Sequence, residues 1–140
     1  MQITRQADYA VRAVLHLAKM DNGTRAATSR IAEEQKIPPS FLAKIVSQLS
    51  VAGVVQTSRG ARGGVSLARD PSEINLLEVI EAIDGPIMLN ECVNDRSVCT
   101  FGDACPVHGI WREAQSELVE RLTKTHFGML AVEKNGKKPS

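Results

Sequence analysis

Apolar residues recur at helical spacing near the start of the chain and predict two helices. Over residues 6–20 they return every three or four positions, which is the pattern of a helix with one buried face. Thr4 is the expected cap of this helix. A shorter helix is expected over residues 30–35, capped by Thr28 or Ser29 and ended by the prolines that follow it.

A third helix, expected from residue 39 to about residue 52, carries two different faces. The apolar face predicts contact with a core and consists of Leu42, Ile45, Val46 and Leu49. The other face is small and polar with a single positive charge, and consists of Ser40, Ala43, Lys44 and Ser47. Such a face fits a DNA major groove, whereas a bulky acidic face would not.

Two short strands are expected after this helix, at residues 54–56 and 65–67, joined by a glycine-rich loop over residues 57–64. Arg59 and Arg62 place two guanidinium groups in that loop. Three helices followed by a basic hairpin are the order of a winged helix-turn-helix, in which the third helix contacts base edges and the wing contacts the DNA backbone or minor groove. The alternative is a winged-helix fold used for protein contacts.

The remainder of the chain predicts two more helices. The first covers residues 76–83 and ends at Gly85, and the second is long and runs from Pro106 to about His126. A long helix with an apolar face beyond the core is a candidate for pairing with its copy in a homodimer. That face comprises Val107, Ile110, Trp111, Ala114, Leu118 and Leu122.

The expected fold is therefore mainly α, a winged helix-turn-helix DNA-binding domain with a two-stranded wing and a long C-terminal dimerisation helix. The boundaries are 1–84 for the DNA-binding domain, 85–105 for a cysteine loop, 106–132 for the dimerisation helix and 133–140 for a polar tail expected to be disordered. The single aromatic residues are expected in the core, namely Phe41, Phe101, Trp111 and Phe127.

Composition and charge limit the possible partners. The chain has 140 residues, 43% of them hydrophobic, which is enough for one domain with a core. It has no apolar run of about 18 residues, and charges interrupt its start where a signal peptide would be apolar, so we expect a cytoplasmic protein without membrane contact. Residues 1–72 carry ten Lys or Arg and five Asp or Glu. Residues 73–105 carry one Lys or Arg and seven Asp or Glu. Only the N-terminal half is therefore expected to face a polyanion.

Cys92, Cys99 and Cys105 form a C-x6-C-x5-C pattern, and His108 follows the last cysteine. Clustered thiols in a reducing compartment indicate metal or redox chemistry, because structural disulfides are rare there. Three cysteines and a histidine are a zinc ligand set, and thiolates also suit an iron-sulfur cluster. Spacing alone leaves these two interpretations even, and a third is that bare thiols are oxidised to a disulfide.

Four segments of the chain occur together in one known family. They are MQITRQADYAVRAVLHLA at the start, SRGARGGVSLA in the expected wing, LLEVIEAIDGPI, and the cysteine loop closing in CPVHGIW. Over residues 1–127 the chain thus resembles the Rrf-two (Rrf2) family of bacterial winged-helix regulators. The resemblance implies a homodimer that binds a roughly palindromic double-stranded DNA operator. It also implies an iron-sulfur cluster, 2Fe-2S or 4Fe-4S, held by the three cysteines and one other ligand, and so favours a cluster over zinc.

The family implies two candidates for the other ligand. In some members it is a histidine three residues past the last cysteine, which corresponds to His108 here. In others it is an aspartate of the first helix, reaching across from the partner subunit, which corresponds to Asp8. The chain has both. It differs from one member in a longer first cysteine gap and in having Ala43 where that member has an acidic residue, so cluster type and operator sequence stay open.

The resulting hypothesis is a transcriptional regulator whose operator affinity is controlled by an iron-sulfur cluster sensing redox state, nitric oxide or iron-sulfur status. The expected DNA contacts are Thr28, Ser40, Lys44, Ser47, Arg59 and Arg62. The alternatives are a zinc-structured or thiol-based DNA-binding repressor and, from another class, an iron-sulfur electron-transfer protein, which would need no basic wing. No enzyme is expected, because the spacing singles out no catalytic set.

Overall fold

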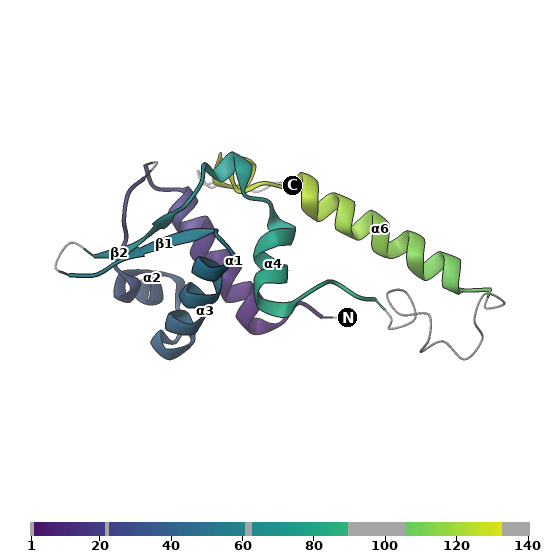
Figure 1. The fold of residues 1–140 in the computed structure, drawn as a ribbon, viewed down its shortest axis with the longest axis horizontal. Coiled ribbons are helices and arrows are strands. Elements are labelled where there is room, and N and C mark those ends of the chain that lie inside the picture. The colour runs from purple at the N-terminus through teal and green to yellow at the C-terminus, as the bar shows by residue number, and fades with distance from the viewer. Residues whose placement is uncertain (1, 22, 61–62, 90–105, 133–140) are drawn as a thin grey trace.

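Three helices and a β-hairpin lie at one end of the protein, and a long helix extends from the other (Figure 1). In this computed structural model the described residues are 2–21, 23–60, 63–89 and 106–132, and the statements below concern them. We refer to residues 2–84 as the head. The elements are α1 (Arg5–Ala18), α2 (Thr28–Gln35), α3 (Pro39–Val51), β1 (Val55–Ser58), β2 (Gly64–Leu67), η1 (Pro71–Glu73), α4 (Leu76–Asp84), α6 (His108–Lys124) and α7 (Phe127–Val132).

Helix α1 is the central helix of the head. Its predicted cap is confirmed, because the Thr4 hydroxyl accepts a hydrogen bond from the Ala7 N–H at 3.1 Å. The helix contacts α2, α3, α4 and α7. Small side chains allow this close packing, and Ala7 and Ala10 are completely buried.

The predicted cap of α2 is wrong. Neither Thr28 nor Ser29 precedes the helix, which begins at Thr28 and has Ala27 as its cap residue, without a side-chain hydrogen bond. The reason lies in the neighbouring residue, since Ala26 exchanges two backbone hydrogen bonds of 2.8 Å with Val65 of β2. This bridge holds the chain extended up to Ala27, and the helix begins directly after it.

The turn between α2 and α3 fixes the helix-turn-helix. Lys36 ends α2 in the left-handed conformation, with φ 54° and ψ 45°. Ile37 follows and is buried, which ties the turn to the core. Pro39 then occupies the first position of α3, where a missing N–H costs nothing. The predicted boundaries of α3 and its buried stripe are confirmed.

The predicted wing is confirmed, and each of its strands has four residues where three were expected. Strands β1 and β2 pair antiparallel, with Val55 opposite Leu67. Gly64 has a φ of 153°, and a Cβ atom there would lie 2.6 Å from the carbonyl oxygen of Ala26. Glycine is therefore needed where the chain before α2 joins the edge of the hairpin.

The long C-terminal helix is shorter than predicted at both ends. Helix α6 begins at His108, because Pro106 and the next residue form a turn before it. It ends at Lys124, since Thr125 is extended and its carbonyl oxygen accepts a hydrogen bond from the Leu76 N–H at 2.8 Å. The segment expected to be one helix over residues 106–132 is thus two, and α7 packs against α1 and η1.

The expectation that the aromatic residues are core residues is correct for Phe127, which is completely buried. It is wrong for Phe41 and Trp111, which are 42% and 40% exposed. Phe41 lies at the surface with its ring 6.3 Å from that of Tyr9. Trp111 belongs to α6, the helix that extends away from the head (Figure 1). Phe101, in the predicted cysteine loop, and the predicted tail 133–140 lie outside the described residues.

Candidate DNA interface and metal centre

The predicted recognition face lies on the surface of α3. Ser40, Lys44 and Ser47 are all exposed, while the opposite stripe of the helix is buried against the core. Thr28 is also exposed, at the start of α2. Figure 1 shows α2, α3 and the hairpin at the same end of the molecule. The predicted contacts at the start of α2 and on α3 therefore both lie on the exposed surface of the helix-turn-helix.

The wing carries one predicted contact that can be placed. Arg59 follows β1 directly and is exposed. Arg62 lies outside the described residues. An exposed guanidinium on a hairpin beside a recognition helix can reach the DNA backbone or minor groove.

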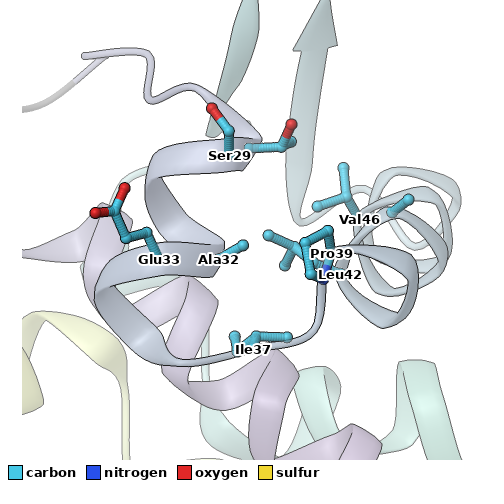
Figure 2. A pocket seen from close by; sticks show the side chains of 9 residues that line it. Ser29, Ala32, Glu33, Ile37, Pro39, Leu42 and Val46 are labelled. Carbon is cyan, nitrogen blue, oxygen red and sulfur yellow. The ribbon is translucent and has the colours of Figure 1, made fainter.

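A groove between α2 and α3 was not predicted (Figure 2). It has a volume of about 540 Å³ and lies between the two helices of the helix-turn-helix. Its floor is apolar and buried, and consists of Ala32, Ile37, Leu42 and Val46. Its rim is exposed and includes Thr28 and Ala43, which belong to the surface described above. The small side chains of Ala32 and Ala43 leave room for this opening, but they do not by themselves determine how the two helices cross.

The three cysteines of the predicted metal site, Cys92, Cys99 and Cys105, lie outside the described residues. Both candidates for the other ligand are described, and their surroundings differ. His108 is the first residue of α6 and is 8% exposed. Its Nδ1 atom is buried and has no hydrogen-bond partner among the residues that the structure describes. Since a buried polar atom without a partner is costly, a metal bound at this nitrogen would remove a penalty.

Asp8 is already paired. Its carboxylate lies 3.1 Å from a guanidinium nitrogen of Arg12, and its side chain is 58% exposed. Arg12 also donates a hydrogen bond of 3.1 Å to the Gln35 carbonyl and lies over the ring of Tyr9. Binding a metal at Asp8 would therefore replace an existing ion pair.

Asp8 and His108 are not brought together within one chain. Asp8 lies on α1 in the head, whereas the first turn of α6 lies at the end of that helix farthest from the head (Figure 1). Across the described ranges, no three His, Cys, Asp or Glu side chains form a group that could hold a metal ion. No helix there is long and apolar enough to cross a bilayer.

The apolar face of α6 is only partly covered. Leu118 and Leu122 pack against Ile80 of the head and against Ile87, which follows α4. Toward the other end of the helix, Ile110 is 59% exposed and Val107 and Trp111 are 44% and 40% exposed. One half of the predicted stripe thus contacts the protein's own head, and the other half faces solvent.

Comparison with known proteins identifies the family to which this chain belongs. A model of the Rrf2 family, described as "Iron-dependent Transcriptional regulator", matches residues 3–133. The chain belongs to the Rrf2 family. Rrf2 regulators bind DNA, so the chain is a DNA-binding transcriptional regulator, and its relatives form a class of regulators rather than enzymes, as predicted.

Individual Rrf2 relatives agree with this assignment over most of their length. The regulator NsrR of Shouchella clausii is 31% identical over 123 residues, which cover 87% of this chain and 83% of that protein. The regulator IscR of Escherichia coli O1:K1 is 33% identical over 130 residues, covering 93% and 80%. Among solved structures, CymR (YrzC), the global cysteine regulator of B. subtilis, matches with a TM-score of 0.82 at 27% identity, covering 96% of this chain and 99% of that one. The predicted winged-helix fold is thereby confirmed.

Proposed function

We propose that this Rrf2 regulator acts in the cytoplasm as a homodimer whose affinity for a palindromic operator is controlled by an iron-sulfur cluster. Cys92, Cys99 and Cys105 would hold the cluster, and His108 would be its fourth ligand. The observation that carries the proposal is the buried Nδ1 of His108, which has no hydrogen-bond partner among the described residues. His108 stands three residues past Cys105, and the family is described as iron-dependent. Such a cluster supplies reactivity toward oxidants, nitric oxide and iron shortage.

The segment that enters the cysteine loop offers a route from the cluster to the DNA-binding head. The Thr4 hydroxyl donates to the Asp84 carboxylate at 2.5 Å, and the Thr4 N–H donates to it at 3.2 Å. The Leu89 N–H donates to the side chain of Gln115 on α6 at 3.0 Å. The two ends of the segment 84–89 are therefore bonded to the start of α1 and to α6. A loop ordered by a cluster would hold this segment, and a loop without one would release it.

The dimer proposal rests on the exposed half of the α6 stripe. An apolar surface of this kind on a projecting helix is buried when two copies pair around a twofold axis. In such a pair, the α6 helices would fix the separation of the two recognition helices, which must be about 34 Å or a multiple to enter successive major grooves.

Replacing Ile110 with Glu is expected to break the dimer. Two buried isoleucines would be lost and two carboxylates would face an apolar surface, so the dissociation constant should rise about 100-fold or more. Analytical ultracentrifugation measures it. Arg112→Glu is the matched control, because residues two positions apart lie on opposite sides of a helix. A monomeric parent protein, or a dimer unaffected by Ile110→Glu, would contradict the proposal.

Arg59 and Lys44 are proposed to contact DNA in different ways. Arg59, on the wing, would contact phosphate, so Arg59→Ala should weaken binding to any duplex and reduce the slope of log affinity against log salt by about 0.9. Lys44, on the recognition helix, would contact a base edge, so Lys44→Ala should weaken operator binding by about 1–3 kcal/mol and affect a scrambled duplex much less.

Fluorescence anisotropy at several salt concentrations measures both effects. The operator is first selected from a random duplex pool with the purified protein. Lys124→Ala is the control, since Lys124 pairs with Glu120 at 2.7 Å on α6. An unchanged salt slope in Arg59→Ala, or equal losses on both duplexes in Lys44→Ala, would refute the respective contact.

The ligand proposal predicts unequal effects of two alanine variants. Anaerobically purified parent protein should be coloured and contain iron, with the cluster type given by its absorption and Mössbauer spectra. His108→Ala should lose most of its iron, because the cluster loses an imidazole ligand, whereas Asp8→Ala should keep it. The reverse result would identify Asp8 of the partner subunit as the ligand. An iron-free parent protein with stoichiometric zinc would refute the cluster itself.

A regulator without a cluster is the second candidate. What favours it is the likeness to CymR, which is named as a cysteine regulator and not by iron. In that case the three cysteines would act as thiols or bind zinc, and oxidation would form a disulfide. The iron measurement above separates the two candidates.

A further inference from the structure

The groove between α2 and α3 lies where DNA bases would approach. On its rim, Pro39 and Ala43 are exposed and four residues apart, so they share one face of α3. On the side of α2, the rim is formed by Ser29 and Glu33 (Figure 2). Both helices of the helix-turn-helix thus contribute to one concave surface beside the predicted recognition face.

The chemistry of the groove differs from that of the face beside it. Ser40, Lys44 and Ser47 are polar, whereas on the α3 side the groove has the apolar rim residues Pro39 and Ala43 above its buried apolar floor. Its α2 side is polar and consists of Thr28, Ser29 and Glu33. In the major groove of DNA, thymine is distinguished by its C5-methyl group, which apolar side chains such as alanine contact. We propose that this groove receives the methyl group of an operator thymine and that Ala43 determines the preference. The inference rests on the proposed operator binding and extends it to one base.

The negative charge of Glu33 on the rim disfavours a phosphate group as the occupant of the groove. The Glu33 carboxylate is exposed and makes no hydrogen bond or ion pair within the part of the chain that the structure describes. A carboxylate at the rim disfavours a phosphate group, so the groove is better suited to an uncharged base edge than to the DNA backbone or an anionic small molecule. A base edge carries no net charge and can approach it.

The expected effect is that of burying one methyl group. Removing the methyl by replacing thymine with uracil changes nothing else on the base edge, so affinity should fall about fourfold at each half-site. In a twofold-symmetric operator, the paired replacement should therefore cost about 15-fold.

The experiment is a uracil scan of the selected operator. Duplexes are made with deoxyuridine at one symmetric pair of thymines at a time, and their dissociation constants are measured by anisotropy. We expect one pair to show the 15-fold loss and the other pairs to remain near the parent value. In Ala43→Gln, a polar amide covers the rim. For this variant, the dissociation constants of the uracil duplex and the thymine duplex at that pair should be about equal. Ser50→Gln is the control, because Ser50 is exposed on the same helix and is not part of the groove.

The outcomes separate this inference from the proposed function. If the operator binds but no uracil pair weakens it, the groove receives no thymine methyl, while operator binding stands. If one pair is sensitive and stays equally sensitive in Ala43→Gln, the methyl contacts another part of the protein and the inference is overturned. If no duplex is bound, both the inference and the proposed operator binding fail.

Discussion

A short pairing of extended backbone holds the long helix to the DNA-binding head. The Leu76 N–H donates to the Thr125 carbonyl at 2.8 Å, and the Phe127 N–H donates to the Ile74 carbonyl at 3.0 Å. The completely buried Phe127 belongs to the same core cluster as Ile74. A free rotation of α6 against the head would break these two backbone hydrogen bonds and remove the Phe127 ring from the core. Both changes cost free energy, so the rotation is restricted. These contacts therefore couple the orientation of α6 to that of the head, which carries α3.

A second attachment lies at the far end of α4. The bonds from Thr4 to Asp84 and from Leu89 to Gln115 connect α1 and α6 on either side of the segment that leads into the cysteine loop. In the proposed account, a few directed hydrogen bonds would connect the cluster, the dimerisation helix and the DNA-binding head. In the proposed dimer, a small rotation at this point would change the separation of two recognition helices that must match the helical repeat of DNA. Such a coupling requires no large conformational change.

The sequence predicted those features that depend on neighbouring residues. The cap at Thr4, the buried stripe of α3 and the hairpin follow from local spacing and turn residues, and all three are present. The long helix was predicted to end at about His126 and ends at Lys124. The sequence did not show what causes this end or the separate helix α7 beyond it, because both depend on backbone pairing with Ile74 and Leu76, about 50 residues earlier.

Features that depend on how elements pack were predicted less well. Periodicity correctly placed Trp111 on an apolar face, but it gives no information on whether another element covers that face. The groove between α2 and α3 likewise depends on how the two helices cross, which single residues such as Ala43 do not determine. The sequence also could not show that Nδ1 of His108 is buried without a hydrogen-bond partner in the described part of the chain, because it gives only the spacing between His108 and Cys105.

Control of DNA binding by the cluster is the central claim, and it is tested most directly on one preparation in two states. The anaerobically purified dimer is divided, and one half is stripped of iron with a chelator under reducing conditions. Both halves are then titrated against the selected operator in a gel-shift experiment at one salt concentration. The account predicts that the two dissociation constants differ by about tenfold or more, a typical allosteric coupling. Equal dissociation constants for the loaded and stripped dimers would contradict it.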